Sequence, residues 1–198
     1  MSLTAIALVC TLKPSPARSS SELMATQILD ALKDHDVAGE VVRVVDFDVK
    51  PGVEADMGDG DDWPALREKV LAADILVFST PIWLGHASSV AHRVLERLDA
   101  ELGAEGNPAP FGKVAVVAVV GNEDGAHAVC ADVFQGLNDV GFTIPAAAGA
   151  YWNGEAMGSV DYQDLPAVPE LVQQTIDNVA SSAAHLAGLL RAAPYASA

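Results

Sequence analysis

The 198-residue chain carries 27 acidic and 11 basic side chains, and its formal net charge of −16 disfavours a nucleic acid or an anionic membrane surface as a partner. Hydrophobic residues make up 51% of the sequence and charged residues 19%, which argues against disorder and provides for one buried core. Every long apolar stretch is broken before the roughly 18 residues that a membrane span needs, so we expect no membrane insertion.

Strand-like and helix-like segments alternate from the N-terminus onward. Residues 4–11 form an apolar, β-rich run, and residues 23–32 carry apolar side chains at helical spacing. A second strand is predicted over 40–47, and a short helix begins near Asp62 after an acidic, glycine-rich loop. The almost continuously apolar segment 73–80 predicts a third strand that is buried on both faces.

The same alternation continues in the second half of the chain. An amphipathic helix over 90–102 leads to the segment 113–121, which has the composition of a fully buried strand. A helix over 129–140 precedes a weaker fifth strand over 142–152, where a proline favours the edge of the sheet. Residues 171–190 predict a long amphipathic helix.

Five strands joined by helices predict a parallel sheet with helices on both faces, in a single domain over 1–190. We expect residues 191–198 to form a disordered tail. Right-handed crossovers leave two common strand orders, the dinucleotide-binding order and the order 2-1-3-4-5. In both orders ligands bind at the carboxyl ends of the strands, near the point where the order reverses.

The first loop at these strand ends, TLKPSPARSSSE (11–22), contains no glycine. This excludes the G-x-G-x-x-G fingerprint and the Walker A loop, which both need glycine to bring backbone against phosphate. The loop instead offers hydroxyl groups and two cations at the start of a helix, whose free N–H groups favour an anion. We therefore predict a phosphate monoester site, with an ordinary serine N-cap and solvated cations as the alternative. Its candidate residues are Thr11, Lys13, Arg18, Ser19, Ser20 and Ser21.

The other two loops follow the third and fourth strands. In TPIWLGHASS (80–89), Trp83 offers a wall on which a flat heteroaromatic ligand can stack, and the small residues let the next helix approach closely. Packing of Trp83 under a helix or in a subunit interface is the alternative. In GNEDGAH (121–127), the glycines and an asparagine indicate a tight turn that faces a ligand or simply solvent. His127 is a candidate to cap the ligand or donate a proton, or else a surface residue.

The stretches STPIWLG, TLKPSPARSSSELM and VVGNEDGAH together resemble the NAD(P)H-dependent FMN reductase family of flavoproteins, and the resemblance extends over residues 4–190. It implies a flavodoxin-like α/β three-layer sandwich whose five-stranded parallel sheet has the order 2-1-3-4-5. Here CTLK replaces the G-S-x-R of the family, and Leu84 follows the aromatic residue. The resemblance places Thr11, Lys13, Ser19 and Ser20 at the FMN phosphate, Pro81, Ile82, Trp83, Leu84 and Gly85 at the ring edge, and Gly121, Asn122 and Gly125 in the third loop.

The expected function is therefore FMN-dependent transfer of reducing equivalents from NAD(P)H to a quinone, free flavin or similar small-molecule acceptor. The flavin carries the chemistry, so no catalytic side chain is assigned. The resemblance also implies a homodimer or homotetramer, with Trp152 and the last helix as interface candidates. A flavodoxin-type electron carrier and a non-enzymatic oligomer without cofactor are the alternatives.

Other features suggest no further chemistry. Cys10 and Cys130 stand far apart without a CxxC neighbour, so we expect buried thiols in a reducing cytoplasm and no metal site. The acidic segment 52–63 lacks the ligand spacing of a calcium loop and is expected to be solvated. No G-x-S-x-G elbow is present, so a hydrolase is not indicated.

Overall fold

The computed structural model describes residues 2–103 and 106–196. Within these ranges a six-stranded sheet has the order β2-β1-β3-β5-β6, and the short β4 pairs antiparallel with the end of β3. The strands are β1 (Leu3–Val9), β2 (Val37–Arg43), β3 (Ile75–Trp83), β4 (His86–Ala87), β5 (Val114–Gly121) and β6 (Gly149–Asn153). The helices are α1 (Ser20–Lys33), α2 (Trp63–Ala72), α3 (Ser89–Leu98), α4 (Ala126–Asp139) and α5 (Glu170–Ala192).

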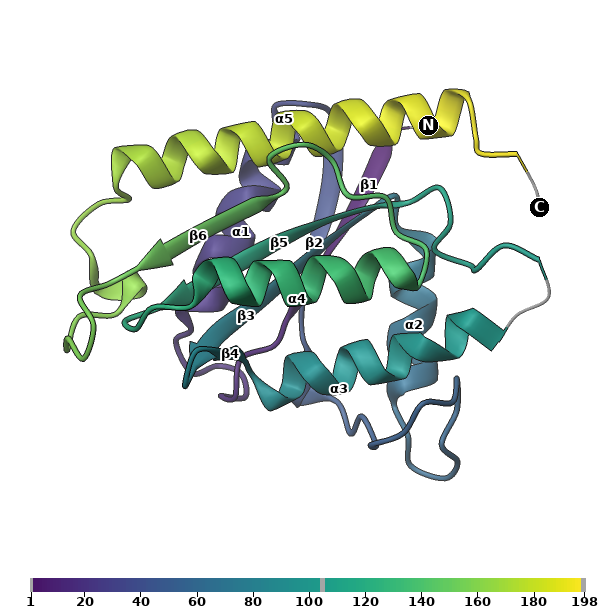
Figure 1. The fold of residues 1–198 in the computed structure, drawn as a ribbon, viewed down its shortest axis with the longest axis horizontal. Helices are drawn as coiled ribbons and strands as arrows, with labels where there is room; N and C mark the ends of the chain where they lie inside the picture. The colour runs from purple at the N-terminus through teal and green to yellow at the C-terminus, as the bar shows by residue number, and fades with distance from the viewer. Residues whose placement is uncertain (1, 104–105, 197–198) are drawn as a thin grey trace.

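Helices cover both faces of the sheet, as Figure 1 shows. Helices α1 and α5 share one apolar core with the sheet, and α2, α3 and α4 share the other. Strand β5 alternates between the two: Val117 and Val119 point into the core with α4, while Val116 and Ala118 point into the core with α5. This two-residue period explains why buried central strands are apolar throughout. The predicted flavodoxin-like α/β sandwich is confirmed, and β5 and β6 are the fourth and fifth predicted strands.

The boundaries of three strands differ clearly from the predictions. The second strand, predicted over 40–47, covers Val37–Arg43 and is followed by a 3-10 helix. The fifth strand, predicted over 142–152, is regular only from Gly149, and Thr143 makes just an isolated bridge to Val114. Pro145 lies between them and has no N–H to donate, which explains the interruption. The expected edge position of this strand is confirmed. The third strand, predicted to end at residue 80, continues to Trp83 because β4 folds back on it.

The C-terminal residues are ordered beyond the predicted boundary at 190. Helix α5 continues through Ala192. The Tyr195 ring lies 4.8 Å from the Phe111 ring between centroids, and the two hydroxyl oxygens of Tyr195 and Thr143 are 3.1 Å apart. These contacts fall within the segment predicted as a tail, up to residue 196, while residues 197–198 lie outside the described part of the chain.

A buried ion pair organises the acidic segment between β2 and α2. The side chains of Arg97 and Asp61 are both 0% exposed, and their closest atoms, Nη2 and Oδ2, are 2.7 Å apart. Arg97 also donates to the carbonyl oxygens of Lys50 and Glu54. The Arg97 hydrogen bonds hold the pKa of Asp61 far below its usual range. The segment is thus fixed by α3, and the prediction of a wholly solvated loop is wrong for Asp61.

Two further sequence expectations concern the cysteines and the membrane. Cys10 and Cys130 are free and buried, and burial raises the pKa of Cys10 strongly and that of Cys130 to about 11. The described residues contain no group of three or more side chains placed to hold a metal ion. Among the described helices, none combines the length and the apolarity that crossing a bilayer requires.

Candidate functional site

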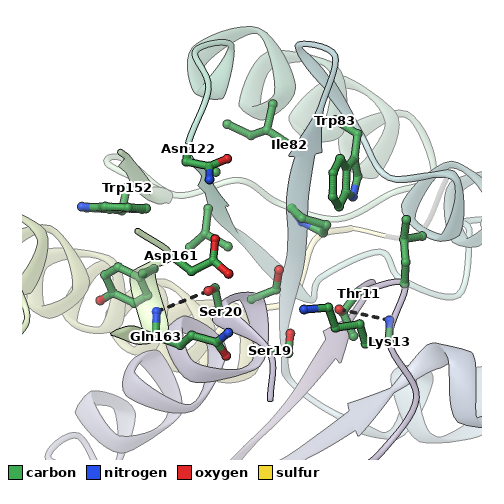
Figure 2. A pocket seen from close by; sticks show the side chains of 16 residues that line it. Thr11, Lys13, Ser19, Ser20, Ile82, Trp83, Asn122, Trp152, Asp161 and Gln163 are labelled. Carbon is green, nitrogen blue, oxygen red and sulfur yellow. Dashed lines mark hydrogen bonds between the residues drawn. The ribbon is translucent and has the colours of Figure 1, made fainter. Parts of the chain in front are cut away.

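A pocket opens at the carboxyl ends of β1, β3 and β5, on both sides of the point where the strand order reverses. All three loops singled out in the sequence contribute to it, together with β6 and the segment before α5 (Figure 2). It is lined by Thr11, Leu12, Lys13, Ser19, Ser20, Ser21, Pro81, Ile82, Trp83, Val120, Gly121, Asn122, Trp152, Asp161, Tyr162 and Gln163.

One end of the pocket is the N-terminus of α1. Ser19 is the N-cap, and its Oγ accepts a hydrogen bond from the Glu22 backbone N–H at 3.3 Å. Ser20 Oγ accepts from the Gln163 backbone N–H, also at 3.3 Å. Because both oxygens already act as acceptors, both O–H groups stay available to donate to a ligand. The serine N-cap and the phosphate site are therefore compatible rather than alternative assignments.

Positive charge at this end comes from Lys13 and the helix. Lys13 is the only cationic side chain among the described residues that line the pocket, and in Figure 2 it extends toward Thr11 and the serines. The unpaired N–H groups at the start of the 14-residue α1 add the positive end of its dipole. Hydroxyl donors, one cation and a helix N-terminus together suit a phosphate group.

Side chains of Arg43 and Asp46, at and after the end of β2, fix the conformation of the loop that carries Lys13. The guanidinium of Arg43, which is 5% exposed, donates to the carbonyl oxygens of Lys13 at 3.0 Å and Ala17 at 2.8 Å. Asp46 accepts from the backbone N–H of Ser15 at 2.8 Å and from its hydroxyl at 2.6 Å. These bonds from Ser15 hold the pKa of Asp46 below its ordinary value. The glycine-free loop is thus fixed by side chains that bind its backbone.

The other end of the pocket is aromatic and apolar. Trp83 is 53% exposed, and Figure 2 shows its ring standing at the pocket wall above the loop of Lys13. Ile82 and Gly121 form the neighbouring wall, where a Cβ on Gly121 would lie 2.9 Å from the Ile82 Cβ. Glycine is therefore needed at this position for the two strand ends to pack. Asn122 is oriented by a 2.9 Å hydrogen bond from its Nδ2 to the Gly158 carbonyl oxygen.

Three predicted site residues lie outside the pocket wall: Leu84 and Gly85 of the ring-edge loop and Gly125 of the third loop. The carboxylate of Glu123 accepts hydrogen bonds from the backbone N–H groups of Leu84 at 3.1 Å and Gly85 at 3.2 Å. A Cβ on Gly125 would lie 2.9 Å from the Gly85 Cα, so glycine permits the two loops to touch. These residues fasten the Trp83 loop to the loop after β5, and their direct contact with a ligand stays a prediction.

Two further predicted residues, Arg18 and His127, are also absent from the pocket wall. Arg18 Nη1 lies 2.9 Å from Asp164 Oδ1, and its Nη2 donates to the Gln163 carbonyl oxygen at 2.7 Å. This pairing turns Arg18 toward the segment before α5. The exposed ring of His127 meets the Tyr151 ring edge-on at 5.0 Å between centroids.

Sequence reasoning missed several lining residues. Trp152, which the resemblance suggests only as an interface candidate, lines the pocket and packs against Tyr162 at 5.5 Å between ring centroids; its role in an interface stays a prediction. Asp161, Tyr162 and Gln163 approach from a segment more than 140 positions away from Ser20. The polar and aromatic run DYQD just before the last helix is a weak signal that could have marked this segment. Leu12 and Val120 gave no signal.

The residues present fit a phosphorylated flavin. The phosphate finds hydroxyl donors and a cation, and the ring finds aromatic and apolar walls at the opposite end. In addition, Gln163 Oε1 is a buried acceptor without a hydrogen-bond partner. Buried acceptors usually have a hydrogen-bond partner, so this oxygen is available to a donor on a ligand.

Comparison with known proteins agrees with this chemistry. A family model described as NADPH-dependent FMN reductase matches residues 4–156. The chain is 35% identical to 8-demethyl-8-aminoriboflavin-5'-phosphate synthase of Streptomyces davaonensis, over 98% of this chain and 81% of that protein. The crystal structure of RosB with bound 8-demethyl-8-formylriboflavin-5'-phosphate superposes with a TM-score of 0.88 at 34% identity, covering 98% of this chain and 82% of that one.

Two other proteins resemble the chain, one over a small part of its own length and one in fold alone. The chain is 39% identical to the divalent metal cation transporter MntH of Mycobacterium bovis over 82% of its own length, but it spans only 25% of that protein. The apo NADH:FMN oxidoreductase EmoB shares the fold, with a TM-score of 0.67 at 19% identity over 97% of this chain and 92% of that one. The family model and the relatives of known structure together show that the chain belongs to the NADPH-dependent FMN reductase family, as a flavin-dependent oxidoreductase with FMN as cofactor and NAD(P)H as co-substrate.

Proposed function

We propose that the protein passes reducing equivalents from NAD(P)H through bound FMN to a quinone, a free flavin or a similar small acceptor. The observation that carries this proposal is a single pocket with a phosphate-binding end at α1 and an aromatic end at Trp83, on the two sides of the strand-order reversal. Neither end is informative alone, but their combination matches an anionic tail and a flat ring. The type of redox reaction is inferred from the family to which the chain belongs.

The side chains in this proposal bind and orient. Bound FMN supplies hydride acceptance from a nicotinamide and electron donation to an acceptor. The hydroxyl groups of Thr11, Ser19 and Ser20 and the ammonium group of Lys13 hold the phosphate. Trp83 and Ile82 support the ring end, and the 53% exposure of Trp83 leaves room beside it for a second planar molecule. A face that admits nicotinamide and acceptor in turn supports a ping-pong cycle.

The test is a visible absorption spectrum of the purified protein, followed by anaerobic stopped-flow mixing of the FMN-loaded protein with NADH or NADPH. We expect a flavin spectrum that bleaches on a catalytic timescale and returns on addition of a quinone or free riboflavin. Flavin that binds but does not bleach on that timescale supports the electron-carrier alternative. A colourless protein that takes up no added FMN supports the non-enzymatic alternative.

A second function is favoured by the identity to the synthase from Streptomyces davaonensis, which covers 98% of this chain. In this alternative the pocket binds a riboflavin phosphate as the substrate whose ring is modified, and the same phosphate end serves it. Mass spectrometry of the flavin recovered after turnover separates the two proposals. An unchanged mass supports the reductase, and a changed mass supports flavin modification.

We also infer that a homodimer or homotetramer covers the mouth of the pocket. Leu84 is 89% exposed and Met157 is 96% exposed. Both lie next to the ring end, since Leu84 follows Trp83 and the Met157 backbone N–H donates to the Asn122 carbonyl oxygen. Light scattering after size exclusion should give a dimer or tetramer, and Leu84→Asp should lower the mass and the flavin affinity together. A monomeric wild-type protein would contradict this inference.

A further inference from the structure

The segment before α5 forms a wall of the pocket that lies beyond the residues matched by the family model. The match ends at residue 156, whereas Asp161, Tyr162 and Gln163 line the pocket. In Figure 2 this wall stands between the α1 end and Asn122. It is therefore placed to meet whatever joins the two ends of a bound ligand.

Three contacts fix this wall to α1 and the loop before it. The Tyr162 hydroxyl donates to Gln27 Oε1 at 2.6 Å, and the Gln163 backbone N–H donates to Ser20 Oγ at 3.3 Å. In addition, Asp164 Oδ1 lies 2.9 Å from Nη1 of Arg18 in the loop before α1. A wall held at three points presents its remaining polar atoms in a set direction, so Asp161 has a defined place in the pocket.

Asp161 has no partner for its carboxylate among the described residues, and Figure 2 shows that carboxylate between Ser20 and Asn122. An ionised carboxylate only accepts hydrogen bonds. A second acceptor without a partner, the buried Gln163 Oε1, belongs to the same wall. Neither acceptor can donate a hydrogen bond to a phosphate. Both can accept hydrogen bonds from hydroxyl groups on the part of the ligand that follows the phosphate.

We propose that Asp161 is a specificity-determining residue that accepts hydrogen bonds from the hydroxylated carbon chain between the phosphate and the ring of the flavin. The inference rests on the proposed binding of a flavin in this pocket. It assigns the segment before α5 a role in selecting ligands with a polyol chain. The negative charge of Asp161 also lowers the affinity for a phosphorylated ligand, because it repels the phosphate at the adjacent serines.

The test compares three ligands by fluorescence titration: FMN, riboflavin, which lacks the phosphate, and lumiflavin, which lacks the hydroxylated chain. Asp161→Ala should weaken riboflavin binding about tenfold or more, as expected for a lost charge-assisted hydrogen bond, and leave lumiflavin binding unchanged. Asp161→Asn keeps an acceptor oxygen and removes the repulsion, so FMN should lose less affinity than riboflavin. Asp132→Asn, an exposed acid on α4, is the control for the change in net charge.

The outcomes separate this inference from the proposed function. If the wild-type protein binds flavins and Asp161→Ala leaves the riboflavin dissociation constant unchanged, the inference is overturned and the proposed function stands. Equal weakening of lumiflavin would also overturn it, because the effect would then not involve the chain. A wild-type protein that binds none of the three ligands refutes both. Circular dichroism checks the fold, and Asp161→Asn provides the answer if the alanine variant does not fold.

Discussion

Replacing both Ser19 and Ser20 with alanine tests the phosphate end of the pocket most directly. Each hydroxyl oxygen accepts a backbone N–H inside the protein, so each O–H is free to donate to the phosphate. A charge-assisted hydrogen bond contributes about 1.5–3 kcal/mol, and two give about 3–6 kcal/mol. This corresponds to roughly 10²–10⁴ in the dissociation constant. Lys13 and the helix N-terminus remain in the variant, so we expect a loss of about 100-fold.

Isothermal titration with FMN and with riboflavin provides the measurement and its internal control. Riboflavin has no phosphate, so its affinity should stay within about twofold of the wild-type value. The Ser19 substitution also removes the N-cap of α1, which costs about 1 kcal/mol of stability and lowers the Tm by roughly 2–4 °C. Titrations well below the Tm avoid this effect. An unchanged ratio of FMN to riboflavin affinity would refute the phosphate assignment.

Four further predictions concern the ring end and the stability of the fold. Trp83→Ala should shift the absorption spectrum or the redox potential of bound flavin, and no change in either would assign Trp83 to packing alone. Glu123→Ala should make the Trp83 loop more mobile, because it removes two hydrogen bonds to the loop backbone. We expect FMN affinity to fall by up to about tenfold. Unchanged affinity would show that these two hydrogen bonds are not needed to position the loop. Arg97→Ala leaves the buried Asp61 charge unpaired, so urea denaturation at pH 7 should show a loss of about 3–5 kcal/mol. Because the pKa of Asp61 is depressed in the folded state, its contribution to the free energy of unfolding is full above about pH 4 and falls as the pH drops further. Asp61→Asn should therefore weaken the dependence of the free energy of unfolding on pH in this acidic range, and the same pH dependence in both proteins would contradict the prediction.

The location of the site followed from local patterns, while its wall did not. The continuous apolar run of β3 and the glycine-free loop after β1 predicted where the pocket lies, since carboxyl ends of neighbouring parallel strands share one edge of the sheet. The sequence could not show that Arg18 turns away to Asp164. The hydrogen bond between Ser20 and Gln163 spans 143 positions, and nothing in either local pattern indicates it.

The sequence by itself determined the α/β alternation and the three loops, because strand burial, helix periodicity and N-cap chemistry act over a few residues. The family followed from the resemblance of the three loop motifs to a known family. The tertiary structure alone decided which residues of those loops line the pocket and which lie outside its wall. Leu84, Gly85 and Gly125 lie outside the wall, where Glu123 accepts the backbone N–H groups of the first two and Gly125 packs closely against Gly85. Such a choice depends on atoms brought together by folding, so no local pattern can contain it.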